Sequence, residues 1–308
     1  MRMRKVILLM AAVLSIAPAV KAADNGLVLW YNYEENAEWK AAGAVQDQSG
    51  MANNGLLEDT WAVGMPTYAP STPGHGSSMV FGYGTYAAQG STNLGWNNIV
   101  AAKSDSLAHV GTMFSMGGWI RVDSTVGYDN YYQYAKMIST PNYELTMQAT
   151  DDPASYFWPW AQEANPWGTD GSWDMTLANS GAYEGQWMHM IVSYDGSTFT
   201  QYINGVAVFT ATDFAHQFDD TVWDQDTVYW TNEPLRIGAA LSGFGANTGW
   251  LRGALDDTAI WGNAYLDAAG VAELYNGTKN PLTVHTTPEP ATLLLLGLGF
   301  ALVRRKKA

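Results

Sequence analysis

The sequence predicts an all-β fold in which two antiparallel sheets pack into a sandwich. From Asp24 to about Pro281, short runs of alternating apolar and polar residues are separated by turn residues, and Gly, Asn, Thr, Tyr and Trp are frequent. This pattern is typical of a sandwich or a barrel. One stretch has clear helix signals, and 308 residues are enough for a single large all-β domain.

The first 23 residues are expected to be a signal peptide that is removed on export. Basic residues at positions 2, 4 and 5 precede an apolar run from Val6 to Val20, and small residues follow Lys21. A basic start, an apolar middle and a small-residue cleavage site define a secretory signal. Cleavage is expected after Ala22 or Ala23. A membrane anchor is the alternative, but a span needs about 20 apolar residues.

Two strands stand out in the middle of the chain. Residues 114–122 alternate, so one face is expected to carry Phe114, Met116, Ile120 and Val122. Residues 187–194 are apolar almost throughout, which indicates a strand buried on both faces. His189 lies in this strand, where we expect its imidazole to make a structural hydrogen bond.

A hairpin is predicted over residues 199–209. Residues 199–203 and 206–209 flank Asn204-Gly205. Both central residues of a type I′ turn need a positive φ, which Asn and Gly tolerate.

One short helix is predicted near the C-terminal end of the domain, over residues 268–275. Asp267 can cap it, Leu266 can pack onto Val271, and Asn276-Gly277 supplies the stop. Residues 279–287 have the composition of a linker.

The last 21 residues, 288–308, have three parts. Pro288-Glu289-Pro290 precedes an apolar stretch, residues 291–303, and a basic cluster that includes Arg304 and Arg305 follows. These parts are similar to the PEP-CTERM sorting tails of Gram-negative bacteria. The resemblance implies processing by an exosortase, transient membrane insertion through the tail, and delivery to the cell surface, the outer membrane or the extracellular matrix.

Six motifs occur in the order of a known family. They are residues 26–30 with 47–50 and 53–55, then 81–82, 114–122, 187–196 with 202–205, 235–238, and 253–260. The chain resembles the LamG-like, concanavalin A-like jelly rolls over residues 24–278. The resemblance implies an antiparallel jelly-roll sandwich and a binding module. Residues 151–173 and 213–230 look like insertions, and Met51-Ala52 departs from the usual turn.

The charge of the domain excludes some partner classes. Four of the 15 basic residues lie in the signal and four in the tail, whereas one of the 29 acidic residues lies in the tail. The domain keeps 7 basic and 28 acidic residues, a net charge of about −21. Such a field disfavours nucleic acid and anionic membrane and favours cations, although acidity also serves solubility. The absence of cysteine excludes disulfides and thiolate chemistry.

Catalytic motifs are not found. The Glu-x-Asp-x-x-Glu strand of glycosidases on this scaffold is missing, as are the Gly-x-Ser-x-Gly elbow and the His-Glu-x-x-His metal motif. We therefore expect a protein that is not an enzyme.

A structural Ca²⁺ ion is expected from the resemblance. Ca²⁺ takes oxygen ligands from carboxylates, amides and carbonyls. Asp47 and Asp256 are the candidates that the resemblance implies, with Asn53 as a third. Asp257 is expected to alternate to the other side of its strand. The alternative is that these residues cap turns.

Large aromatic residues gather in the first insertion: Tyr156, Trp158, Trp160, Trp167 and Trp173. Exposed rings on polar loops are costly, so they are either packed down or used for recognition. Sugar rings can stack on indole while polar neighbours bind hydroxyl groups. These residues are candidate glycan ligands, and a lid packed on the sandwich is the alternative.

The sequence thus favours an exported, noncatalytic binding protein of the surface or matrix, with a glycan or a surface protein as its ligand. A glycan-cleaving enzyme on the same scaffold and a purely structural matrix component are the alternatives.

Overall fold

The structure is a computed structural model of the chain. It describes residues 25–59, 65–71, 75–85, 94–101, 104–108, 110–123, 134–139, 143–148, 154–159, 173–176, 185–212, 234–239 and 251–288. Within these ranges no helix is long and apolar enough to cross a membrane.

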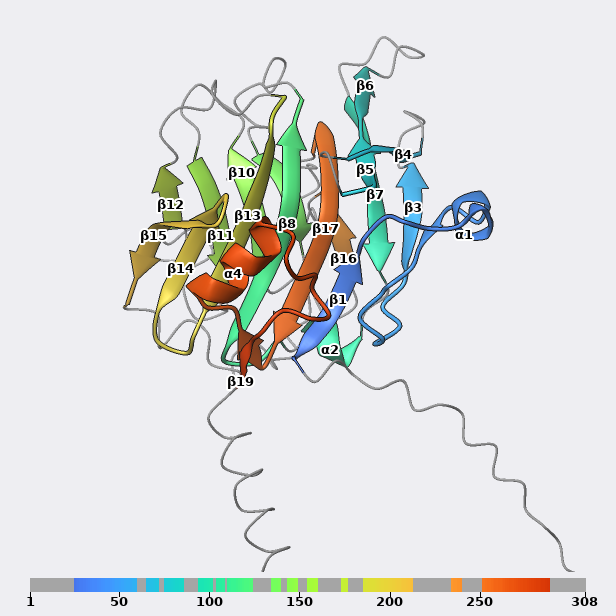
Figure 1. Cartoon of the computed structure of the whole chain (residues 1–308). Helices are drawn as coiled ribbons and strands as arrows, with labels where there is room; N and C mark the ends of the chain where they lie inside the picture. Colours follow the sequence, from blue (N-terminus) through green and yellow to red (C-terminus); the bar gives the residue numbers. More distant parts are fainter. Residues whose placement is uncertain are drawn as a thin grey trace, which may run out of the picture.

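Two antiparallel sheets form the sandwich (Figure 1), and we call them sheet A and sheet B. Sheet A has the order β15-β14-β13-β8-β17-β5-β4, and β1 also pairs with β17. Its strands are β1 (Leu27–Tyr31), β4 (Thr67–Pro70), β5 (Ser77–Phe81), β8 (Phe114–Val122), β13 (Trp187–Tyr194), β14 (Phe199–Ile203), β15 (Val206–Ala211) and β17 (Gly253–Gly262).

Sheet B has the order β12-β11-β10-β9-β16-β7-β3-β2, and β6 also pairs with β7. Its strands are β2 (Ala44–Val45), β3 (Gly55–Asp59), β6 (Tyr83–Thr85), β7 (Leu94–Ala101), β9 (Tyr134–Ser139), β10 (Tyr143–Gln148), β11 (Ala154–Pro159), β12 (Trp173–Thr176) and β16 (Leu235–Ile237). The short helices α1 (Ala37–Ala41) and α2 (Asp105–Ala108) lie in connections. The predicted two-sheet jelly-roll class is confirmed.

The main core lies between the sheets. It contains the predicted inner face of β8, Phe114, Met116, Ile120 and Val122, together with the inner faces of β13 and β17. Burial of apolar side chains from both sheets in one layer is the main stabilising contribution to such a sandwich.

A second core covers the other face of sheet A. Here α4 (Ala268–Tyr275) and the residues that follow it pack on the outer sides of β1, β13 and β17 (Figure 1). The buried side chains in this layer are Leu27, Trp30, Ile191, Tyr202, Ala259, Trp261, Leu266, Val271, Leu274 and Val284. The central strands of sheet A are therefore buried on both faces, as the sequence predicts for residues 187–194.

The segment after α4 differs from the expected linker. We call residues 277–288 the strap. Pro281 and Val284 are buried, and Thr287–Pro288 forms β19, which pairs with β18 (Ala264–Tyr265). The strap is ordered because the apolar outer face of sheet A needs a cover that α4 alone does not supply.

The predicted hairpin and helix are present where expected. Asn204 and Gly205 have φ of 50° and 79°, as a type I′ turn requires. The side chain of Asp267 accepts a hydrogen bond from the N–H of Gly270 at the start of α4. Gly277 follows the helix with φ of 65°.

A β-bulge interrupts β17 where it pairs with β8. The register moves from Asp256 opposite Trp119 to Ala259 opposite Gly117, so β17 has one extra residue. Asp257 lies within this bulge, and its φ is 47°. A bulge re-aims side chains that would otherwise alternate. One carboxylate oxygen of Asp256 and one of Asp257 lie within 4.8 Å, although alternation predicts opposite sides.

Gly118 allows the close approach of β8 to this bulge. Its φ is 153°, and a Cβ there would lie 2.6 Å from the carbonyl oxygen of Asp257. We expect Gly118→Ala to lower the free energy of unfolding by roughly 2–4 kcal/mol, because it adds both backbone strain and a clash with backbone. Urea unfolding checks this. Gly82→Ala is the matched control, since its Cβ would meet nothing within 4 Å. Equal stability of the two variants would contradict the tight fit.

Candidate functional site

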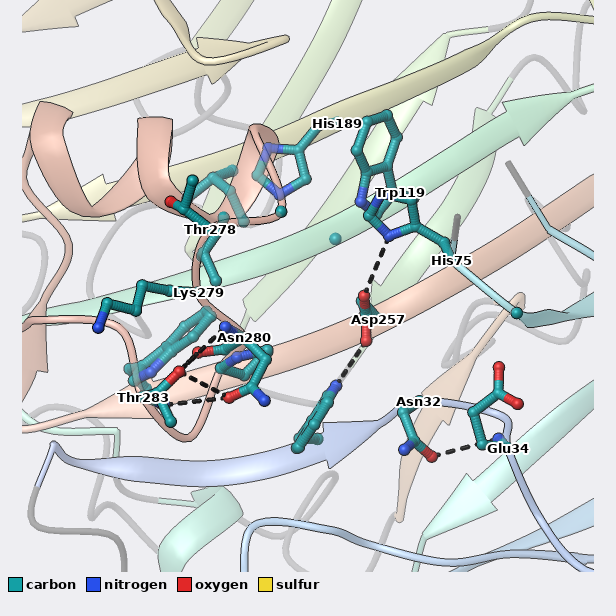
Figure 2. Close-up of a pocket in the computed structure, with 18 residues that line it drawn as sticks. Asn32, Glu34, His75, Trp119, His189, Asp257, Thr278, Lys279, Asn280 and Thr283 are labelled. Atoms are coloured by element: carbon teal, nitrogen blue, oxygen red, sulfur yellow. Dashed lines mark hydrogen bonds and ion pairs between the residues drawn. The ribbon is translucent and has the colours of Figure 1, made fainter. Parts of the chain in front are cut away.

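A groove of about 520 Å³ opens on the outer face of sheet A, beside α4 and the strap. Its floor comes from β1, β8, β13 and β17, including Trp30, Trp119 and Trp261. Asn32, Glu34 and His75 line one end, and strap residues line the other (Figure 2). The groove joins apolar ring surface with many polar groups, which is the usual composition of a small-ligand site.

Asp257 is the central acidic group of the groove. Its Oδ1 accepts a hydrogen bond of 2.8 Å from Nε1 of Trp30, and its Oδ2 lies 3.6 Å from Nδ1 of His75. Figure 2 shows the carboxylate of Asp257 directed toward the imidazole of His75. The bulge in β17 places it there.

Trp119 joins the groove to α4 through a cluster of rings. Its ring centroid lies 4.9 Å from that of His75, 5.1 Å from that of His189 and 5.7 Å from that of Tyr275, on which it stacks. Trp119 is only 8% exposed, so a small part of the indole faces the groove. These contacts hold the ring rigidly.

His189 is buried beneath this cluster. Burial, and then the nearby His75, lower its pKa from 6.5 to about 3, so the imidazole is neutral at physiological pH. Its Nδ1 has no hydrogen-bond partner among the described residues, and the same is true of Nε1 of Trp261. The expected structural hydrogen bond of the imidazole is therefore not made at Nδ1. Buried polar atoms without partners are uncommon and mark places where a partner is missing.

Asp256 lies behind Asp257 and is fully buried. One oxygen accepts from the N–H of Asp257 at 2.8 Å, and the other accepts from the hydroxyl of Ser71. Burial, and then the charge of Asp257, raise the pKa of Asp256 to about 8. Asp256 is thus largely protonated at pH 7, and Asp257 provides the charge at the groove.

Asp47 and Asn53 lie in a different polar cluster, in the loop after β2. Oδ1 of Asp47 accepts from the N–H groups of Trp30 and Ser49, and Oδ2 accepts from the Ser49 hydroxyl and the Asn53 N–H, all at 2.7–3.0 Å. The side chain of Asn53 donates to the carbonyl of Val28 at 2.8 Å and accepts from the hydroxyl of Ser104 at 2.6 Å. The hydrogen bonds to Trp30 and Val28 hold this loop against β1.

A possible metal-ligand group occurs elsewhere in the described residues. His75, Asp256 and Asp257 each offer one atom, and these atoms lie within 4.8 Å of one another. Of the three residues expected for Ca²⁺, this group contains Asp256.

Three of the aromatic candidates of the first insertion have a described backbone, and all three belong to sheet B. Tyr156 and Trp158 lie on β11 and Trp173 on β12, in the outer strands of sheet B, where Phe157 pairs with Trp173. Part of the insertion thus extends sheet B. Trp160 and Trp167 lie outside the described residues, as do Glu289, Pro290, Arg304 and Arg305 of the tail, whereas Pro288 belongs to β19.

Sequence reasoning missed His75, Trp30, Trp119 and the strap as parts of one site. A lone histidine in a Pro- and Gly-rich loop carries no pattern. Tryptophans on the second face of strands 27–31 and 253–262 were the available signal, since they require a cover over sheet A.

A family model described as the concanavalin A-like lectin/glucanases superfamily matches residues 94–271, more than half of the chain. The chain belongs to this superfamily. A second model, the PEP-CTERM protein-sorting motif, matches residues 286–307 and indicates an exported protein of the cell surface in Gram-negative bacteria. Comparison with curated proteins gave no match.

Solved structures share the concanavalin A-like fold at low identity. The chain is similar to domain 4 of AbnA, an extracellular arabinanase from Geobacillus stearothermophilus, solved with arabinotriose (16% identity, 82% of this chain and 98% of that chain, TM-score 0.51). It is also similar to the binding domain of Paraclostridial Mosquitocidal Protein 1 (15% identity, 84% of this chain and 53% of that chain, TM-score 0.53). A structure of botulinum neurotoxin type C, whose cell entry depends on two ganglioside molecules, is similar as well (13% identity, 84% of this chain and 52% of that chain, TM-score 0.52). The chain spans about half the length of the two toxin domains.

The pKa of His189 predicts a specific acid sensitivity of this concanavalin A-like domain. Between about pH 6.5 and pH 3 the unfolded chain binds a proton at this residue and the folded chain does not, so stability falls as the pH is lowered. This group contributes a slope of up to about 1.4 kcal/mol per pH unit. We expect His189→Gln to remove that slope in urea unfolding curves recorded from pH 4 to pH 7. His285→Gln, at an exposed position, is the control and should keep it. An unchanged slope in His189→Gln would contradict the assignment.

Proposed function

We propose that this chain is an exported, noncatalytic binding protein of the cell surface or matrix, and that the groove beside α4 binds carbohydrate. The observation that supports this most directly is the groove itself, which is lined by carboxylate, amide, hydroxyl and imidazole groups together with the tryptophans Trp30, Trp119 and Trp261. Sugars offer hydroxyl groups to such polar side chains and apolar ring faces to aromatic residues.

The polar groups are positioned for binding. Asp257 is held by Trp30 at the centre of the groove. At the strap end, Oδ1 of Asn280 accepts from the N–H groups of Leu282 and Thr283, which fixes its amide group. Preorganised side chains lose little entropy when a ligand binds.

A noncatalytic role fits the state of the acidic groups. Glycoside cleavage needs one carboxylic acid and one carboxylate that both reach the scissile bond. Asp256, with its raised pKa, is fully buried, and the carboxylate of Glu34 accepts from the N–H of Ser77 at the start of β5. These contacts favour structural and binding roles over proton transfer to a ligand.

The test is binding of the purified protein to a glycan array, with the affinity for the best glycan then measured by calorimetry. We expect Asp257→Asn to weaken that affinity by about tenfold or more, because a charge-assisted hydrogen bond is lost. Asparagine tolerates the positive φ at this position, so the bulge is kept. Glu38→Gln is the control. It also removes one negative charge, but from an exposed position outside the groove, so this variant should bind normally.

The same assay separates the groove from the aromatic insertion. A joint replacement of Trp158 and Trp160 by Ala should leave binding unchanged if the groove holds the glycan. Loss of binding in this double variant, with normal binding by Asp257→Asn, would place the site in the insertion instead.

We also propose that Asp256 and Asp257 hold a structural Ca²⁺ ion. Their oxygens suit this cation, which would displace the proton of Asp256 when it binds, and the open groove gives water access to its remaining coordination positions. The carboxylate of Asp47 fits less well, because four donors of the protein already occupy it.

If Ca²⁺ binds, it stabilises the folded state by mass action. Addition of Ca²⁺ should then raise the melting temperature, by about 4 °C or more at a concentration well above Kd. EDTA should reverse the increase, and Asp256→Asn should abolish it. Asp47→Asn should lower the melting temperature but keep the increase. A melting curve insensitive to both Ca²⁺ and EDTA would exclude the ion.

A further inference from the structure

The sorting signal begins inside the folded domain. The PEP-CTERM motif match starts at residue 286, and residues 286–288 are part of the strap. The hydroxyl of Thr286 donates to the carbonyl of Asn25 at 2.8 Å. In β19, Thr287 pairs with Tyr265 and Pro288 with Ala264. The first proline of Pro-Glu-Pro is therefore fixed on the sandwich.

The strap is also held upstream of the motif. Val284 is buried in the second core, and Nδ2 of Asn25 donates to the carbonyl of Pro281 at 2.7 Å. The carbonyl of His285 lies so close to α4 that a Cβ on Gly270 would be 2.8 Å from it. Asn25 thus holds the strap at two points, one on each side of Val284.

This arrangement conflicts with ordinary recognition of a peptide by an enzyme. Extended segments are bound through their backbone groups, often by strand addition. The backbone at Thr287 and Pro288 is already paired with β18 along one edge, so an enzyme that adds a strand at this edge must first displace β18. A two-residue strand is marginal by itself, so it can open locally at a small fraction of the cost of unfolding the domain.

We propose that β19 must detach from β18 before the processing enzyme can take the sorting motif, so the domain controls access to its own tail. The partner is a membrane-embedded exosortase that needs Pro288 and the following residues as an extended chain. Detachment also needs the Thr286–Asn25 bond to break, whereas the apolar anchor at Val284 remains in place. This inference concerns access alone and does not depend on what the groove binds.

The test uses the full chain, produced in a Gram-negative host that carries an exosortase. Tyr265→Cys with Thr287→Cys places two cysteines at paired positions, and paired Cα atoms lie within disulfide range. The natural sequence has no cysteine, so no other disulfide can form within one chain. We expect the oxidised fraction to lose its tail at least about tenfold more slowly than the reduced fraction of the same sample, measured by pulse-chase and intact mass. Each single-cysteine variant is a matched control and should be processed like the natural chain.

A second variant loosens the strap. Thr286→Val keeps the shape of the side chain and removes its hydrogen bond to Asn25. One such bond corresponds to about a threefold to tenfold change in the opening equilibrium, so the tail should be removed several times faster. Thr210→Val, which removes an exposed hydroxyl on β15 outside the strap and the groove, should process at the natural rate. Processing of the oxidised pair at the rate of the reduced pair would overturn the proposal, and so would an unchanged rate in Thr286→Val.

Discussion

Sheet A carries apolar side chains on both faces, and most of the remaining architecture follows from this constraint. The inner face packs on sheet B, as in any sandwich. The outer face, with Leu27, Trp30, Ile191 and Trp261, would expose a large apolar patch if it stayed open. α4 covers one part and the strap covers another. The groove lies where these covers leave polar and aromatic groups of the sheet in contact with solvent.

The bulge in β17 supplies the groove with its charge. A regular strand would place Asp256 and Asp257 on opposite faces, with one of them in the main core. The extra residue brings their oxygens together and leaves Asp256 buried, where its raised pKa avoids the cost of a second charge. Gly117 and Gly118 are needed beside the bulge because a Cβ at either position would collide with backbone of a neighbouring strand. One irregularity therefore determines the shape and the electrostatics of the site.

The features predicted from sequence are those with local signals. β8 and β13 follow from alternation and apolar density, the hairpin from Asn204-Gly205, and α4 from its cap and stop. The sandwich class and the superfamily follow from several such motifs in order. The bulge was missed because strict alternation is the default for a strand. The groove was missed because its residues come from positions 30 to 283, and sequence spacing carries no signal for contacts between segments so far apart.

The strap shows why composition alone misled. Residues 279–287 include three Thr and one Pro, and Pro288 follows, which is typical of a linker. Two residues order this segment. Val284 is buried in the second core. Asn25, about 260 positions earlier in the chain, hydrogen-bonds to the strap on either side of Val284. Few anchors are enough to order such a segment, because it also buries an apolar sheet face that would otherwise be exposed to water.

The position of the strap also relates the groove to the tail. Asn280, Pro281 and Thr283 form a wall of the groove, and Thr286 to Pro288 belong to the sorting motif a few residues later. A ligand that contacts the wall binds the attached strap better than a detached one. By linkage, the bound ligand then shifts the equilibrium of the strap toward the attached state. Detachment of the strap lowers the affinity for the ligand by the same factor. The size of this coupling depends on how far opening spreads upstream of Thr286. Because Val284 keeps its place in the second core when β19 detaches, the wall is preserved and the coupling is small.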